Sequence, residues 1–142
     1  MRVWIQSPFD NLPQEGYRKQ RFWLMAEAFA RKGHDVVYWT GDFNHMAKAA
    51  RKIVAPETGG GIELKIFPVI PYFENVGLRR VASHRAYARD WLRLASAEGA
   101  AAKPDVIITA CPTISAAEAA LKLGRMFSAK TAVDIMDAWP ET

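Results

Sequence analysis

The sequence predicts an α/β fold in which a Rossmann-like parallel sheet carries helices on both faces. Short runs of β-branched and aromatic residues alternate along the chain with helical patterns, which implies right-handed crossovers between parallel strands. The run 106–109 is continuously apolar, as in strands that are covered on both faces. Half of the 142 residues are apolar, which is enough for one core. We therefore expect a single domain over residues 1–142.

The first half of the chain predicts two strands joined by a helix. The strands are expected over residues 2–6 and 35–40, which are rich in β-branched and aromatic types. Between them, the Pro-containing loop 7–16 leads into a helix over residues 17–32, which Gly33 ends. The apolar stripe of this helix consists of Phe22, Met25, Ala26 and Phe29.

The middle of the chain predicts an irregular segment, a third strand and a long helix. Residues 43–61 are polar and basic, with a weak helical pattern over 46–53. The third strand is expected over residues 62–67, and the helix over 78–98, a stretch without proline or glycine. The residues available for burial on this helix are Val81, Tyr87, Trp91, Leu92 and Leu94.

The last part predicts two more strands around a helix. The strands are expected over residues 106–109 and 131–135, and residues 136–142 are expected to form a loop. The helix begins at Pro112 and ends near Gly124, because proline is favoured in a first helical turn. Its buried side consists of Ala116, Ala119, Ala120 and Leu123.

The strand order expected for this pattern is 3-2-1-4-5. The winding then reverses between strands one and four, so the ligand crevice lies where the loop 6–16 faces the turn 110–113. At this crevice Gly16-Tyr17-Arg18 should open the first helix and aim backbone N–H groups and a guanidinium at a phosphate or carboxylate. The alternative is that Gly16 only permits the turn and that Arg18 is solvated.

Other candidate binding residues follow the strands. His45 lies in a polar loop near the strand ends and is a candidate acceptor contact. Cys111 has no local Cys-His signature, so we expect it to line the crevice with Thr113 rather than to act as a nucleophile. Asp134 and Asp137 form a close carboxylate pair after the fifth strand. The three histidines share no metal-ligand spacing, and no metal site is expected.

Several function classes are disfavoured. The G-x-G-x-x-G fingerprint is missing after the first strand, so no NAD or FAD cofactor is expected. Arg85, Arg89 and Arg93 recur along one face of the long helix and are expected to be solvated rather than to bind nucleic acid or lipid headgroups. A single cysteine favours a reducing, cytoplasmic compartment, and any membrane contact should be peripheral.

Three stretches carry a family resemblance. Residues 16–18, after a strand and a Pro-rich loop, are similar to a glycine-and-arginine entry to helix one, and residues 26–37 contain a G-H-D-V turn similar to G-H-E-V. Residues 134–141, DIMDAWPE, are similar to D-x-R-D-L-W-P-E, with Met136 in place of the arginine and Ala138 in place of the leucine. Together they resemble the N-terminal domain of family 4 glycosyltransferases of the GT-B fold, in a bacterial branch that works on envelope polysaccharides.

This resemblance implies a metal-independent, retaining transfer of a sugar from a nucleotide-sugar co-substrate to a saccharide or lipid-linked acceptor, at the cytoplasmic face of the membrane. The chain corresponds to the acceptor-side domain, including Asp137 near the crevice. A second domain would bind the donor, so we expect the parent protein, and not this chain alone, to be the enzyme.

Two further expectations accompany this interpretation. The helix that should cover the fifth strand is missing from the sequence, so we expect a homodimer or an exposed apolar edge. The alternative function is a standalone, non-catalytic Rossmann-like module that binds a nucleotide or an anionic partner through Arg18.

Overall fold

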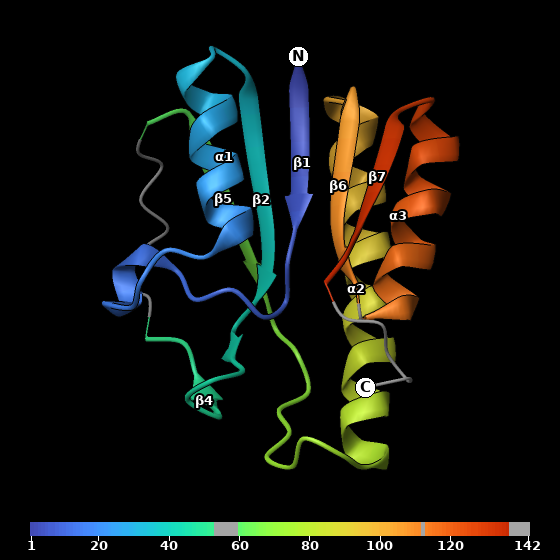
Figure 1. Ribbon diagram of the computed structural model, residues 1–142. Helices are drawn as coiled ribbons and strands as arrows, with labels where there is room; N and C mark the ends of the chain where they lie inside the picture. The colour runs from blue at the N-terminus through green and yellow to red at the C-terminus, as the bar shows by residue number, and fades with distance from the viewer. Residues whose placement is uncertain (53–59, 112, 137–142) are drawn as a thin grey trace.

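The computed structural model describes residues 1–52, 60–111 and 113–136, which form an α/β fold around a five-stranded parallel sheet (Figure 1). From edge to edge the sheet contains β5 (Ile62–Phe67), β2 (Asp35–Gly41), β1 (Arg2–Gln6), β6 (Val106–Cys111) and β7 (Lys130–Ile135). Counted along the chain, these long strands have the predicted order 3-2-1-4-5. The detail that differs is a two-stranded antiparallel hairpin of β3 (Phe43–Asn44) and β4 (Ala49–Ala50), which the sequence did not predict.

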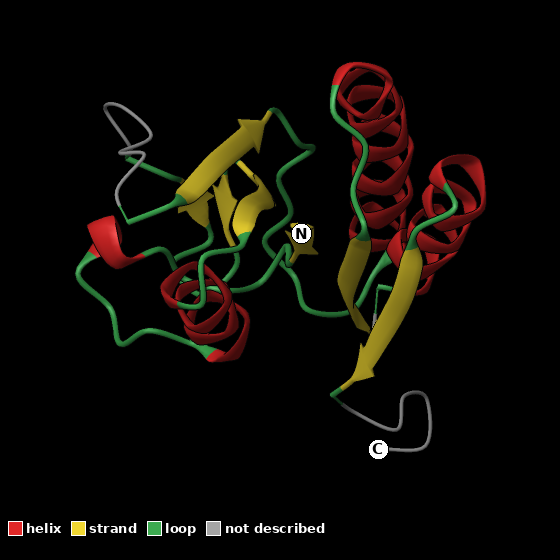
Figure 2. Cartoon of the chain, turned by 90° about the horizontal axis from the view of Figure 1, so that it is seen from above, coloured by secondary structure: helices red, strands yellow, loops and turns green. Residues whose placement is uncertain are grey.

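Helices cover both faces of the sheet, as predicted. In the end-on view, α1 (Arg21–Arg31) lies on one face, and α2 (Leu78–Ala101) and α3 (Ile114–Phe127) lie on the other (Figure 2). A short 3-10 helix, η1 (Pro13–Glu15), interrupts the loop between β1 and α1. Among the described residues, no helix is both long and apolar enough to cross a membrane.

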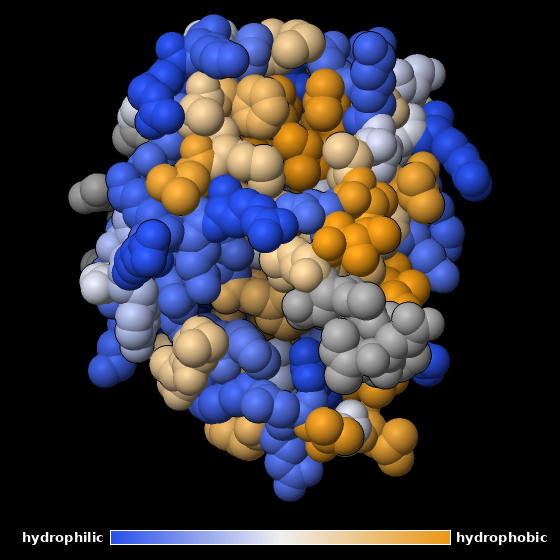
Figure 3. Space-filling view, viewed as in Figure 1, coloured by the Kyte–Doolittle hydropathy of each residue, from blue (hydrophilic) through white to orange (hydrophobic). Residues whose placement is uncertain are grey.

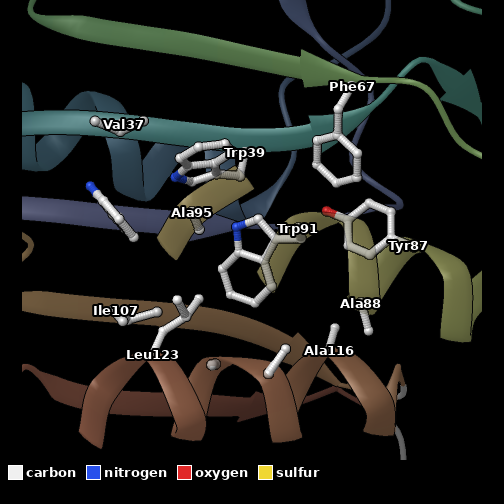
Figure 4. Packing of buried hydrophobic residues seen from close by; sticks show 13 residues of the cluster. Val37, Trp39, Phe67, Tyr87, Ala88, Trp91, Ala95, Ile107, Ala116 and Leu123 are labelled. Atoms are coloured by element: carbon white, nitrogen blue, oxygen red, sulfur yellow. The ribbon is translucent and has the colours of Figure 1, made fainter. Parts of the chain in front are cut away.

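The central strand β1 supplies side chains to two separate cores. Trp4 points toward α2 and α3, whereas Val3 and Ile5 belong to the cluster under α1, as the alternation of a strand requires. On the α2 side, Trp91 is fully buried and lies between Trp39 of β2 and the β6–α3 layer (Figure 4). The predicted buried alanines of α3 are confirmed, and their small size lets the helix approach the sheet closely.

Three predicted features of the elements are wrong. The first helix begins at Arg21 rather than at residue 17, because the Asp10 carboxylate binds the backbone N–H groups of its first turn. Residues 46–52 are not helical, since the Asn44 side chain accepts from the N–H of Ala47 and closes a turn into β4. Val81 is 46% exposed, because the first turns of α2 extend beyond the sheet.

The strand β7 forms one edge of the sheet. Val133 and Ile135 on it are 37% and 70% exposed, so some apolar surface is present as expected. On the opposite side of the strand, Asp134 accepts two hydrogen bonds from Arg21 at 2.8 and 3.0 Å, whereas Ala132 is exposed. The homodimer stays a prediction.

Candidate functional site

A buried ion pair connects the loops at the carboxyl end of the sheet. The Arg51 side chain is 1% exposed and lies 2.5 Å from the Glu15 carboxylate, which is 8% exposed. The other guanidinium nitrogens of Arg51 donate to the carbonyl oxygens of Gly41 at 2.9 Å and Asp10 at 2.8 Å. The second oxygen of Glu15 accepts from the Asn44 amide at 2.9 Å. The loop after β1, the 3-10 helix and the hairpin are thereby fixed to one another.

A carboxylate of this chain occupies the amino-terminal end of α1. Asp10 is 5% exposed and accepts from the backbone N–H groups of Phe22 at 3.0 Å and Trp23 at 3.4 Å. Burial raises the pKa of Asp10 above 3.8, although hydrogen bonds from Ser7 and from the two N–H groups act in the opposite direction. This helix end therefore already holds an anion, and the N–H groups that a ligand phosphate would use are taken.

The predicted entry residues Gly16, Tyr17 and Arg18 lie outside this helix end. Gly16 ends the 3-10 helix with φ at 76°, in the left-handed region, and all three residues are exposed. Their expected place at the helix start is therefore wrong, and Gly16 permits a turn, as the alternative interpretation held. A contact between these residues and an acceptor stays a prediction.

Five side chains gather beside this buried network and form what we term the cationic cluster. They come from the hairpin, from the loop after β5 and from the start of α2, and are His45, Lys48, Tyr72, Arg80 and His84. The Tyr72 hydroxyl lies 2.6 Å from Nδ1 of His45, and Nζ of Lys48 lies 3.3 Å from the same nitrogen. Because an ammonium group can only donate, Nδ1 is an acceptor there, and the ring proton belongs on Nε2.

Aromatic packing builds the floor of the cluster. The Phe9 ring lies 5.2 Å from that of His45 and 5.7 Å from that of His84, both edge to face. Nζ of Lys48 lies 4.8 Å from the centre of the Tyr72 ring, and the Arg80 guanidinium lies 5.9 Å from it on a cation–π approach. The two cations therefore lie against the buried Tyr72 ring, beside the half-buried rings of Phe9, His45 and His84.

The cluster carries positive charge without a matching carboxylate. Among the described residues, no ion pair involves Lys48 or Arg80. Burial, followed by the charge of Lys48 and then of Arg80, lowers the pKa of His45 to about 4. Burial and the Arg80 charge likewise lower the pKa of His84 to about 4, and that of Lys48 below 10.5. The field at this position therefore opposes further positive charge and favours an anion.

The cluster has the donors needed to hold a phosphate beside a hydroxyl-rich group. Lys48 and Arg80 supply cationic donors, the Nε2–H group of His45 supplies a further donor, and the half-buried rings supply apolar surface. Nε2 of His84 is buried and has no hydrogen-bond partner among the described residues. Within the same part of the chain, no group of three or more His, Cys, Asp or Glu residues is placed to hold a metal ion.

A hollow of about 520 Å³ lies on the α2 side of β5, but its lysine already forms ion pairs. Nζ of Lys65 lies 2.8 Å from a carboxylate oxygen of Glu63 and 2.9 Å from one of Glu98. The hollow therefore lacks the unpaired positive charge that distinguishes the cationic cluster.

The other predicted site residues do not join this cluster directly. Cys111 is half-buried at the end of β6, and Thr113 is 1% exposed at the start of α3. Asp137 lies outside the described residues. His84 nonetheless contacts segments on both sides of the predicted crevice. The Phe9 ring, in the loop after β1, packs against the His84 ring. On the other side, the hydroxyl of Ser115, in the first turn of α3, donates to the His84 carbonyl at 3.1 Å.

Sequence reasoning identified His45 but missed its neighbours. Tyr72 and Arg80 stand in or next to an irregular stretch, where no periodicity reveals which side chains turn inward. His84 lies on α2 one helical turn after Arg80 and so shares its face, a spacing that the sequence offers but that indicates no function by itself. Asp10 had a local signal in the spacing Ser7-x-x-Asp10, which is typical of side-chain turns after a strand.

Comparison with known proteins supports the fold. No family model matches the sequence, and neither does any curated protein. The C-terminal domain of PF1911 hydrogenase from Pyrococcus furiosus is similar in structure, with a TM-score of 0.64 at 13% identity, over 94% of this chain and 90% of that domain. A second crystal structure of that domain gives a TM-score of 0.64 at 10% identity.

A GT-B glycosyltransferase is also similar. Arabidopsis thaliana UGT89C1 gives a TM-score of 0.51 at 17% identity, over 92% of this chain but only 33% of that protein. At these identities, the likeness shows the fold alone. The chain thus has a Rossmann-like α/β fold that occurs both as one third of a GT-B glycosyltransferase and as nearly the whole of a hydrogenase domain.

The buried ion pair should be a large contributor to stability. Arg51→Ala leaves the Glu15 carboxylate charged and buried, which costs about 3–5 kcal/mol of unfolding free energy. The double variant Arg51→Met, Glu15→Gln should lose less, because no charge remains unpaired. Urea denaturation measures both, with Arg89→Ala at the exposed pair with Asp90 as the control. Equal losses in the single and double variants would contradict this account.

The histidines should make stability depend on pH. Both rings are neutral in the folded chain, and their pKa of about 4 lies below the ordinary 6.5. Their contribution is therefore complete above about pH 6.5 and is lost as the pH falls toward 4. The double variant His45→Gln, His84→Gln should lose less unfolding free energy than the wild type between about pH 7 and pH 5. His34→Gln, at the opposite end of the sheet, is the control, and parallel curves for wild type and double variant would refute the assignment.

Proposed function

We propose that this chain is the acceptor-side domain of a glycosyltransferase, and that its cationic cluster binds the phosphate-bearing part of a lipid-linked saccharide acceptor. The observation that carries the proposal is the pair of unmatched cations, Lys48 and Arg80, on an aromatic and imidazole surface. This cluster stands at the carboxyl ends of the strands, where ligands of open α/β sheets bind. The fold likeness to one third of a GT-B glycosyltransferase is consistent with a chain that forms one side of a larger cleft.

The finer parts of the proposal rest on motifs. Membership of family 4, an envelope-polysaccharide acceptor and action at the cytoplasmic face of a membrane are supported by the similarity of residues 16–18, 26–37 and 134–141 to that family. In this proposal the nucleotide-sugar binds a second domain of the parent protein. Catalysis then requires both domains, because the second domain must stabilise the charge that develops on the donor.

A standalone module that binds a nucleotide or another anion is the second candidate. The pyrococcal domain, 90% of which this chain covers, shows that the fold also occurs outside GT-B glycosyltransferases. A Rossmann site for a nucleotide uses the free N–H groups at the start of the first helix, and here the Asp10 carboxylate accepts from two of them. The cationic cluster therefore suits an anion better than the helix start does.

Calorimetric titration separates the two candidates. A soluble saccharide carrying a diphosphate should bind, and the double variant Lys48→Gln, Arg80→Gln should weaken binding by about tenfold or more, since hydrogen bonds to charged groups contribute about 1.5–3 kcal/mol each. Lys122→Gln, Arg125→Gln removes the same charge from exposed positions of α3 and should leave binding unchanged.

The same titration with UDP gives the opposing outcome. The proposal expects UDP to bind more weakly than the saccharide diphosphate and through the same two cations, because UDP carries the diphosphate but lacks the saccharide. Tight UDP binding that is abolished in Arg18→Ala, and unaffected in the Lys48 and Arg80 variant, would establish the nucleotide-binding module instead.

A further inference from the structure

The segment between β5 and the second turn of α2 exposes large apolar side chains. Within twelve residues, five of them are 41% to 89% exposed, and we term this group the apolar tip: Ile70, Phe73, Val76, Leu78 and Val81. In the space-filling view, apolar residues emerge among hydrophilic ones at the lower end, where α2 begins (Figure 3). Scattered exposed apolar residues are ordinary, but five of them within twelve residues of one projection indicate an interaction surface.

The residues of the tip do not pack into the core of the domain. The first buried residue of α2 is Ser83, so the preceding helical residues have no sheet or helix beneath them. With 24 residues, the helix is about 36 Å long, whereas a strand of six residues spans about 20 Å. The amino-terminal turns of α2 therefore project beyond the sheet (Figure 1).

Arginines surround the tip. Arg79 and Arg80 stand next to Leu78, and Arg85 and Arg89 follow along the exposed side of the helix. Nε of Arg79 donates to the Pro71 carbonyl at 3.0 Å, and the residue is exposed. Of the acidic residues nearby, Asp90 is already paired with Arg89.

A hollow of about 210 Å³ opens on the tip between apolar and cationic side chains. Its lining includes Phe73 and Leu78 on the apolar part, and Arg79 and Arg80 on the cationic part, with Glu74 as its one carboxylate. Nε of Arg80 is buried there without a hydrogen-bond partner among the described residues. The hollow therefore combines apolar surface with donors for a phosphate.

We propose that the apolar tip inserts into a membrane surface that contains anionic lipids, with Arg79 and Arg85 contacting the headgroup phosphates. Apolar side chains that are rimmed by arginine match the two layers of such a surface, acyl chain and anionic headgroup. A protein partner or a second copy of this chain would have to supply acidic groups opposite the arginines. The inference rests on the membrane location in the proposed function, but it requires no acceptor, since it depends only on the lipid surface.

Vesicle flotation tests the apolar contribution. The protein should bind vesicles of phosphatidylcholine and phosphatidylglycerol, and Val76→Ser, Leu78→Ser should weaken binding by about tenfold or more, because each buried aliphatic side chain contributes about 1.5–3 kcal/mol. Leu121→Ser, Met126→Ser replaces two apolar residues of α3 that are 44% and 58% exposed, and should change nothing. Unchanged binding in the tip variant would overturn the proposal.

The charge contribution is tested with the same vesicles. Arg79→Gln, Arg85→Gln should weaken binding by about tenfold or more, since each basic residue near an anionic surface contributes about 1 kcal/mol. Vesicles of phosphatidylcholine alone should bind the wild type poorly, and equal binding to both vesicle types would contradict the role of the arginines.

Sedimentation velocity identifies the competing occupant. Without vesicles, Val76→Ser, Leu78→Ser should leave the oligomeric state of the wild type unchanged, because the expected dimer edge is β7 and not the tip. A dimer that Val76→Ser, Leu78→Ser converts to monomer, together with no vesicle binding, would replace the membrane with a second copy of this chain. Because the vesicles contain no saccharide, failure here leaves the acceptor proposal standing.

Discussion

The ion pair between Arg51 and Glu15 is the contact on which the carboxyl end of this sheet depends. Three segments that have no regular structure in common meet at it: the loop after β1, the 3-10 helix and the hairpin that follows β2. Burying two charges is costly unless both are fully hydrogen-bonded, and here the remaining atoms bind backbone carbonyls and the Asn44 amide. The hairpin that carries His45 and Lys48 is held against the loop after β1 by this arrangement.

The carboxyl end of the sheet contains one group of paired charges and, beside it, two cations without a carboxylate partner. Asp10, Glu15 and Arg51 satisfy one another or the backbone, and they form a rigid base. Lys48 and Arg80 lie beside that base without a carboxylate partner, and their charges add to burial, the larger cause, in lowering the pKa values of His45 and His84. Repulsion between these unpaired cations destabilises the domain without a ligand, and a bound anion would reduce that repulsion. This electrostatic effect connects the fold with the proposed acceptor.

Regular elements were predictable because their signals are local. The apolar stripe of α1, the alanine face of α3 and the apolar run of β6 each follow from one short stretch of sequence, and the parallel order follows from their alternation. The start of α1 was misplaced because its cap, Asp10, acts from eleven residues upstream of Arg21 rather than from the adjacent position. The cationic cluster was missed for a similar reason, since Tyr72 and Arg80 reach His45 only through tertiary folding of an irregular loop.

A crystal structure of the chain with a saccharide diphosphate would show whether Lys48 and Arg80 bind the phosphates of the acceptor. We expect the diphosphate between Lys48 and Arg80, with the saccharide beside the half-buried rings of Phe9 and His45. A diphosphate bound instead at Gly16 to Arg18, with the cationic cluster empty at saturating ligand, would contradict this expectation.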